Sequence, residues 1–333
     1  MIAYLARRAL WGVFVVVVVV TLVFMVVFAI GDPAATSLGA NASPEQVAQF
    51  EEREGLDHSL ARQYASYLGV MPCVRKSSAN YDGGEGFCGL LQLDFGSSYR
   101  HKEPVFEVIA TRFPRTLLLA VMTLFFELLI GLGLGVLAAT RKGSLFDTGF
   151  MATAFLGISL PTYVTGPIFL LVFAFLYGWF PVGGYGVDFW DHVYHGILPA
   201  FTLAIVGAAT YARVMRSEMV EALRNDYIRT AKAKGVSGSG VVLRHAFRNA
   251  LLPVVTLVGL SMAVLVSGAI ITERVFAWPG MGKLIIDSIH LLDRPVVVAY
   301  LMIIVLMFVT INLVVDILYS ILDPRVRLQD IKT

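Results

Sequence analysis

Charge is scarce in this chain of 333 residues. Asp, Glu, Lys and Arg together make up 15% of the sequence, whereas 57% of the residues are hydrophobic. A soluble domain is usually about one-quarter charged and about half apolar, so this composition is typical of a membrane protein. The net charge of +2 and the lack of a basic tract argue against nucleic acid as a partner.

Motifs that would make the chain an enzyme or an ATPase are also absent from the sequence. It contains no Gly-x-Ser-x-Gly, no His-Glu-x-x-His and no pair of intramembrane aspartates. The stretch most similar to a phosphate-binding loop is residues 277–284. It has the expected Gly282 and Lys283, but Ala277 replaces the first glycine of the loop and Leu284 replaces its Ser or Thr. The sequence therefore predicts that this chain has no nucleotide-binding site.

Six apolar stretches are long enough to cross the hydrocarbon core of a bilayer, which takes about 20 helical residues. They lie near residues 10–30, 116–139, 150–176, 198–214, 251–271 and 297–319. Pro161 and Pro167 predict a kink in the third. The first is too long for the apolar part of a signal peptide, and no cleavage site follows it. We therefore expect an all-α membrane protein with six transmembrane helices.

The distribution of Lys and Arg orients these helices. With the N-terminus inside, the inner segments hold 15 of the 26 Lys and Arg residues. Eight of the outer ones lie in one long loop, where the positive-inside rule carries little weight, and the short outer loop at 177–195 has none. Both termini are therefore expected on the inner side.

The long polar region at residues 31–115 lies outside in this orientation, and we expect it to form a small subdomain. Ser43, Pro44 and Gln46 predict the start of a helix, with serine as the cap, proline in the first turn and glutamine completing a capping box. The two cysteines of the sequence, Cys73 and Cys88, lie in the same region. In an oxidising compartment we expect a disulfide between them, which would stabilise the fold by about 3 kcal/mol. Two free thiols are the alternative.

A second polar region, at residues 215–250, lies on the inner side. We expect a helix at residues 217–234 that ends at Gly235, followed by a Gly/Ser turn and a second short helix with Arg244, His245 and Arg248. The first helix has an apolar face, made of Val220, Leu223, Tyr227, Ile228 and Ala231. This pattern fits either a helix that lies on anionic lipid or a helix that docks into a soluble partner.

The residues themselves favour the second interpretation. Residues 226–235 (Asp-Tyr-Ile-Arg-Thr-Ala-Lys-Ala-Lys-Gly) and 244–253 (Arg-His-Ala-Phe-Arg-Asn-Ala-Leu-Leu-Pro) closely resemble the EAA loop of binding-protein-dependent ABC permeases. The similarity is greatest to the B-type subunit of the dipeptide/oligopeptide permease family, in which arginine stands, like Arg229, where the general motif has glutamate. The resemblance implies a coupling helix that sits in a cleft of the ATP-hydrolysing subunit. The positions that it implies are Asp226, Tyr227, Arg229, Thr230, Ala231, Ala233, Lys234 and Gly235.

The resemblance extends over nearly the whole chain. Residues 94–116 resemble the family's entry into its second membrane helix, residues 273–282 its outer re-entrant segment, and residues 312–325 its C-terminal signature. Two places differ. The stretch around Cys73 and Cys88 looks like an insertion, and Arg294 takes a position that is usually aromatic. Both lie on the outer side, where a binding protein would dock.

The resemblance implies the type I ABC importer permease fold in a bacterial inner membrane. Residues 1–30 would form the N-terminal tail and first membrane helix, residues 31–115 the external subdomain, and residues 116–333 the permease core, with the coupling loop at about 215–250. The implied partners are a C-type permease subunit, two cytoplasmic ATP-binding subunits and an extracytoplasmic substrate-binding protein. ATP and Mg²⁺ would bind to the ATPase subunits, and no cofactor is expected in this chain.

The implied cargo is di- or oligopeptides, and the chain would form half of the translocation pathway. Nickel complexes, glutathione or short oligosaccharides are the alternatives within the same type of importer. An ATP-independent channel and a secondary transporter are alternatives from another class, which the inner loop disfavours. A membrane-embedded enzyme is a third alternative, which the absence of catalytic motifs disfavours.

Glu127 is the unusual residue of the second apolar stretch, because a carboxylate in mid-membrane is costly and tends to face a cavity or a partner. It either lines the pathway, where it would meet the positive end of a peptide, or is protonated or hydrogen-bonded to a neighbouring helix.

Gly131 and Gly135 form a small-xxx-small pair, which predicts close helix packing. His192 and His195, three residues apart in an outer loop, favour an interfacial helix over a metal site.

Overall fold

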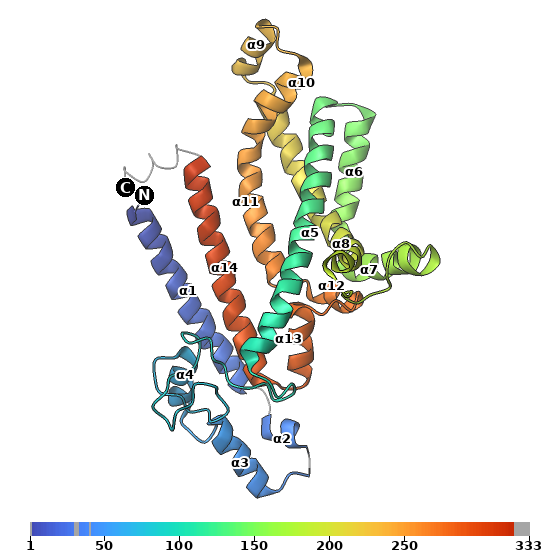
Figure 1. Cartoon of the computed structure of the whole chain (residues 1–333). Coiled ribbons are helices and arrows are strands. Elements are labelled where there is room, and N and C mark those ends of the chain that lie inside the picture. Colours follow the sequence, from blue (N-terminus) through green and yellow to red (C-terminus); the bar gives the residue numbers. More distant parts are fainter. Residues whose placement is uncertain (1, 30–32, 40, 323–333) are drawn as a thin grey trace. The chain divides into compact units, whose positions relative to one another are not determined.

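The computed structural model describes residues 2–29, 33–39 and 41–322, and it contains no β-strand within these ranges. Residue 30 of the first expected span and residues 323–333, with the last positions of the C-terminal signature, lie outside the described residues. The helices, labelled in Figure 1, are α1 (Ile2–Ala29), α2 (Pro33–Leu38), α3 (Pro44–Glu54), α4 (Leu60–Leu68), α5 (Val105–Thr140), α6 (Leu145–Ser159), α7 (Thr162–Phe169), η1 (Leu170–Leu176), α8 (Phe189–Ala222), α9 (Asp226–Ala233), α10 (Gly238–Gly240), η2 (Val241–Ala246), α11 (Phe247–Val266), α12 (Ile270–Val275), α13 (Met281–His290) and α14 (Arg294–Leu322).

Two compact units are built from these helices. The core unit contains Leu117–Trp278, the N-terminal turn of α1 and the part of α14 from Thr310 onward. The disulfide unit contains Arg7–Thr116 and Pro279–Val309. The organisation expected from the sequence, with an external subdomain at 31–115 and a permease core from 116, stays a prediction.

Four helices of the described chain are long and apolar enough to cross a membrane. They are α5, α8, the helix that runs without interruption over Gly238–Val266, and α14 over Arg294–Val315. Shorter apolar helices, at Leu10–Val26 and Thr162–Leu176, correspond to the first and third expected spans. The all-α membrane architecture expected from the sequence is therefore confirmed.

The third apolar stretch is broken rather than kinked. Helix α6 ends at Ser159, Leu160 is extended with φ −88° and ψ 113°, and Pro161 caps the start of α7. Proline pushes the residue before it out of the helical region, which explains why the break falls at Leu160. Figure 1 shows the chain turning away from α6 at this point. Pro167, by contrast, is accommodated inside α7, which continues as the π-helix η1.

The glycine pair of α5 packs against α8 in the core unit. A Cβ atom on Gly131 would lie 2.6 Å from the Cβ of Tyr211, and one on Gly135 would lie 2.7 Å from the carbonyl oxygen of Ala212. Both distances are too short for real contacts, so the two backbones approach as closely as they do because side chains are missing. The expected close packing at the small-xxx-small pair is confirmed.

Replacement of Gly131 by alanine is expected to destabilise the core unit. The added methyl group has to push α5 and α8 apart, and such overpacking typically costs about 1–3 kcal/mol. Gly133→Ala is the matched control, because a Cβ on Gly133 meets nothing within 4 Å. Thermal unfolding in detergent should show a lower midpoint for Gly131→Ala and an unchanged one for Gly133→Ala. Equal midpoints for the two variants would contradict this packing.

The disulfide unit begins its external part with α3, which has the expected capping box. The Ser43 hydroxyl accepts a hydrogen bond from the Gln46 amide, and the Gln46 side chain accepts one from the Ser43 amide. Helix α3 ends at Gly55, whose φ of 68° is left-handed, a conformation that glycine adopts without steric cost. The local signals therefore define both ends of this helix.

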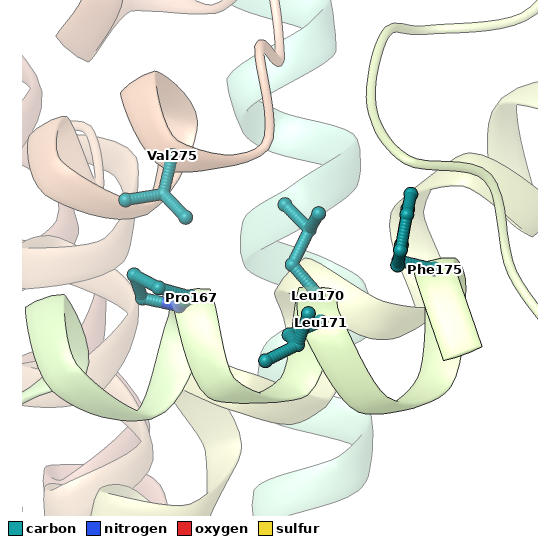
Figure 2. A pocket seen from close by; sticks show the side chains of 5 residues that line it. All are labelled: Pro167, Leu170, Leu171, Phe175 and Val275. Carbon is teal, nitrogen blue, oxygen red and sulfur yellow. The ribbon is translucent and has the colours of Figure 1, made fainter. Parts of the chain in front are cut away.

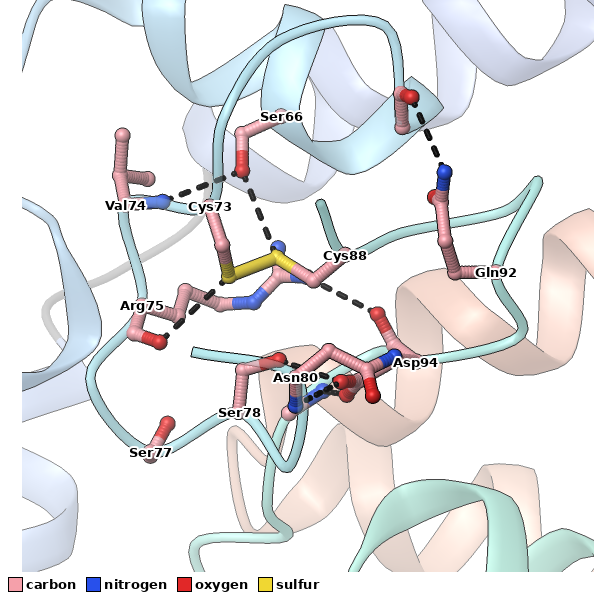
Figure 3. The surroundings of a disulfide bond; sticks show 12 residues. Ser66, Cys73, Val74, Arg75, Ser77, Ser78, Asn80, Cys88, Gln92 and Asp94 are labelled. Atoms are coloured by element: carbon pink, nitrogen blue, oxygen red, sulfur yellow. Dashed lines mark hydrogen bonds between the residues drawn. A yellow bond between two sulfur atoms is a disulfide. The ribbon is translucent and has the colours of Figure 1, made fainter. Parts of the chain in front are cut away.

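The loop after α4 has little regular structure and is organised by Arg75 and a disulfide between Cys73 and Cys88. The Arg75 side chain is buried, with its guanidinium carbon 4.0 Å from the centre of the Tyr67 ring. Its Nη2 donates to the Asp94 carbonyl oxygen at 3.1 Å and to the sulfur of Cys88 at 3.2 Å. Figure 3 shows Arg75 and Asp94 beside the disulfide. Polar contacts thus replace helix and strand as the framework of this loop.

Removal of the disulfide by a Cys73→Ala and Cys88→Ala double substitution is expected to destabilise this loop by about 3 kcal/mol in the chain-entropy model. The 15-residue separation of the two cysteines leaves a long polar segment without its covalent closure. Limited proteolysis should therefore cut residues 76–86 faster in the double variant than in the oxidised parent. Equal rates of cleavage would show that Arg75 and its hydrogen bonds suffice.

Candidate functional site

The inner polar region does not form the single helix expected at 217–234; that prediction was wrong. Helix α8 runs on from the membrane to Ala222, and the amides of Arg224 and Asn225 then bond back three residues, to Glu221 and Ala222. Asn225 is extended, with φ −70° and ψ 152°, and opens α9. Asparagine is among the residues preferred at this cap position, although the Asn225 side chain makes no capping hydrogen bond here.

Helix α9 ends at Gly235, as the sequence predicts. Gly235 has φ 76°, its amide donates to the Lys232 carbonyl oxygen at 3.0 Å, and the Val236 amide donates to the Ala231 carbonyl oxygen at 3.2 Å. These two bonds form a Schellman motif, which needs a left-handed residue at the position of Gly235. A Cβ there would meet nothing within 4 Å, so only the backbone conformation demands glycine.

The second helix of the inner region is not short or separate, as expected, but is the start of the next membrane helix. Ser237 caps it by accepting a hydrogen bond from the Gly240 amide at 3.3 Å, and the chain is then helical through α10, η2 and α11. Arg244, His245 and Arg248 therefore lie in the first turns of a membrane-crossing helix, because the Gly/Ser sequence folds as a helical turn.

Helix α9 is held from behind by two apolar residues. Ile228 and Ala231 are both buried, and Ile228 packs with Val241 and the inner end of α8. Tyr227, which was expected on the same face, is exposed instead. Other predicted site residues are exposed as well, namely Asp226, Arg229, Thr230, Ala233, Lys234 and Gly235. The outward face of α9 thus carries one aromatic ring, several charges and two small residues.

An ion pair that the sequence analysis missed joins α6 to the inner part of α8. Arg216 donates from Nε to one Asp147 oxygen at 2.5 Å and from Nη2 to the other at 2.6 Å. The Gly143 amide adds a hydrogen bond at 2.9 Å. These donors lower the pKa of Asp147 to about 2. The two partners are 69 positions apart in the sequence, which explains why no local pattern could predict the pair.

Glu127 lies inside the core unit rather than in an open pathway. Its side chain is 4% exposed and fits against Gly207 of α8, where a Cβ would be 1.9 Å from its Oε1 atom. Ser261 of α11 lies within hydrogen-bonding reach. The structure therefore places Glu127 among three packed helices, and its role in the pathway stays a prediction.

An apolar hollow of about 520 Å³ lies beside η1 in the same unit (Figure 2). It is lined by Pro167, Leu170, Leu171, Phe175 and Val275. These side chains offer no hydrogen-bonding group to a polar solute. We therefore assign the hollow no part in substrate binding.

Comparison with known proteins decides the family. Residues 131–328 match the model of the family described as "Binding-protein-dependent transport system inner membrane component", and residues 1–120 match the corresponding N-terminal model. The chain belongs to this family. The permease is also 38% identical over 334 residues to the oligopeptide transport system permease protein AppB of Bacillus subtilis, covering 98% of this chain and 100% of AppB.

Other relatives are named for a different substrate, glutathione. The glutathione transport system permease protein GsiC of Salmonella choleraesuis is 38% identical, and that of Escherichia coli K12 is 37% identical, over 328 residues that cover 98% of the permease and 99% of each relative. A chain of the inward-facing MetNI methionine ABC transporter matches with a TM-score of 0.53 and 18% identity, over 65% of this chain and 96% of that chain. That likeness shows the type I permease fold.

The permease is therefore a membrane subunit of a bacterial inner-membrane ABC importer of the peptide or glutathione type. Its relatives are membrane components of transport systems rather than catalysts. Importers of this class work with ATPase and substrate-binding partners.

Proposed function

We propose that the permease imports di- and oligopeptides and that α9 is the helix through which its ATPase partner drives it. The proposal rests on which side chains of α9 are buried and which are exposed. Two of its side chains, Ile228 and Ala231, are buried, and Ile228 packs into the core unit, while the outward face of α9 is exposed. A docked partner can bind this face and displace the helix as a rigid piece.

The proposed assembly contains this chain, a C-type permease subunit, two cytoplasmic ATP-binding subunits and an extracytoplasmic binding protein. ATP and Mg²⁺ are proposed to bind to the ATPase subunits, and this chain is proposed to hold no cofactor. A nucleotide can shift the permease between its outward-open and inward-open states only by its differential affinity for them. Closure of the ATPase pair around ATP supplies that difference, and α9 transmits it.

Short peptides are the proposed cargo because both groups of relatives carry names that refer to peptides, an oligopeptide permease and a glutathione permease. Glutathione is itself a tripeptide with one unusual linkage. Nickel complexes and short oligosaccharides remain alternatives from the sequence, whereas the names of AppB and GsiC refer to peptides.

The test begins with the tagged permease purified from its native host in mild detergent. A second permease and ATPase subunits are expected to co-purify, and uptake of a labelled tripeptide into cells is expected to depend on the chain. Unlabelled dipeptides, glutathione, a nickel chelate and a trisaccharide are then compared as competitors. Competition by the nickel chelate or the sugar alone would overturn the peptide assignment, and a chain that purifies alone would overturn the proposed assembly.

A further inference from the structure

Two neighbouring segments of the external loop contain no charged side chain. They are residues 69–72 (Gly-Val-Met-Pro) and 87–93 (Phe-Cys-Gly-Leu-Leu-Gln-Leu), here called the apolar loop pair. Several of their large side chains are exposed rather than packed: Val70 58%, Met71 47%, Phe87 46%, Leu91 69% and Leu93 44%. In water, this surface would be unfavourable.

The apolar loop pair is held together as one piece. The disulfide links Cys88 of the second segment to Cys73, the residue that directly follows the first, and the Cys73 amide donates to the Gly86 carbonyl oxygen at 2.7 Å. The Gln92 side chain donates back to the Gly69 carbonyl oxygen at 3.2 Å, as Figure 3 shows. Leu93 has φ 55°, a left-handed conformation that favours glycine or asparagine. An apolar side chain at such a place suggests that the apolar surface itself is used.

The position of α4 indicates how close this surface lies to the membrane. Helix α4, which leads directly into the loop pair, packs on the outer half of α1 in the disulfide unit. Tyr64 donates to or accepts from the Thr21 hydroxyl at 2.5 Å, and its ring centre lies 5.2 Å from that of Phe24. The Tyr67 ring, two residues before Gly69, is 5.5 Å from the same Phe24 ring.

Thr21 and Phe24 lie within the apolar part of α1, at Leu10–Val26. Thr21 is eight residues before the end of α1 at Ala29, which corresponds to about 12 Å along the helix. The contacts of α4 therefore fall beside a segment that faces lipid tails or their boundary, and not beyond the end of the span. A loop that leaves α4 at Gly69 begins at this depth.

Charge separates the two sides of the disulfide loop. The segment between the apolar pair, residues 76–86, is polar and carries Lys76, Asp82 and Glu85. Lys76 pairs with Glu52 of α3 at 2.5 Å, which directs this side toward the aqueous part of the subdomain. We propose that the apolar loop pair inserts into the outer leaflet of the membrane and anchors the external subdomain to the lipid surface.

A label on a single new thiol tests the insertion, since both natural cysteines are in the disulfide. Leu91→Cys and Met71→Cys place a thiol on the two apolar segments, and Asp82→Cys is the matched control on the polar side of the same loop. Each full-length variant is reconstituted with its co-purifying subunits into vesicles of phosphatidylethanolamine and phosphatidylglycerol and labelled with an environment-sensitive fluorophore. Quenching by a lipid with a nitroxide near its headgroup is compared with quenching by aqueous iodide.

Labels at positions 91 and 71 are expected to be quenched at least about twofold more by the nitroxide lipid than the label at position 82, and less by iodide. Uniform accessibility to iodide at all three positions would overturn the proposal. Shielding of positions 91 and 71 from both quenchers would overturn it too, because it would show that protein covers the surface. The result is independent of which solute the importer carries.

Discussion

Replacement of Gly235 by aspartate is expected to abolish ATP-driven uptake while the permease still reaches the membrane. The substitution strains the left-handed backbone at φ 76°, at a cost of about 1–2 kcal/mol, and adds a negative charge to the outward end of α9. The Schellman turn that fixes the end of α9 is thereby weakened where the partner is proposed to dock. Coupling free energies between sites are typically about 1–3 kcal/mol, or about 5-fold to 150-fold in affinity, so uptake should fall at least about tenfold.

The measurement compares uptake and ATP hydrolysis in reconstituted complexes. Gly83→Asp is the matched control, because Gly83 also has a positive φ, 57°, and a Cβ there meets nothing within 4 Å, but it lies in the external loop. Gly235→Asn places a residue that is sometimes found at this position of the motif and adds no charge, so it should retain more activity than Gly235→Asp. Full uptake by Gly235→Asp would contradict the role of α9, whereas loss in both Gly83→Asp and Gly235→Asp would indicate a general folding defect.

Reversal of charge at Asp147 is expected to destabilise the core unit strongly. Asp147→Arg places two cations together at a site where the Asp147 side chain is 4% exposed. Removal of one partner of a buried pair costs about 3–5 kcal/mol. Because the Arg216 side chain is 25% exposed and can still contact water, we expect a loss near the lower end, about 3 kcal/mol. The midpoint of thermal unfolding and the ATPase rate should both fall.

The double variant Asp147→Arg, Arg216→Asp restores opposite charges and should recover part of the loss. Because the Arg216 guanidinium holds the pKa of Asp147 near 2, below its ordinary value of 3.8, the contribution of the pair is complete above about pH 4 and is lost only as the pH falls toward 2. The destabilisation in Asp147→Asn should therefore be constant between pH 5 and pH 8. No recovery in the double variant would show that the pair is not the source of the effect.

The local signals of the sequence predict the ends of helices well. Ser43 and Gln46 mark the start of α3, and Gly235 marks the end of α9, because caps depend on residues only a few positions apart. The apolar stretches likewise predict the membrane helices. Leu160 shows the limit of this approach, since proline signals an interruption but not whether the helix bends or breaks.

Contacts between distant residues and a break within a helical pattern could not be predicted from the pattern. The helical spacing continues through residues 217–234, so it conceals the break at Asn225. The Asp147–Arg216 pair spans two helices and depends on how α6 packs on α8. For Glu127, the pattern left open whether it faces a cavity or a helix, and the glycine that makes room for it, Gly207, lies on another helix.

The short connections of α9 make the inner loop a mechanical lever. Only residues 223–225 separate α9 from α8, and only residues 234–237 separate it from the helix at Gly238–Val266. Helix α8 and the helix at Gly238–Val266 are 34 and 29 residues long, or about 51 and 44 Å. The short connections let α9 move little without moving these two helices. If α9 moved by about 3 Å and the shorter helix followed as a rigid body, that helix would tilt by about 4°. Flexible residues inserted in either connection would let α9 move without moving the far ends of these membrane helices. The need to transmit movement, more than surface chemistry, should therefore limit how long these connections can be.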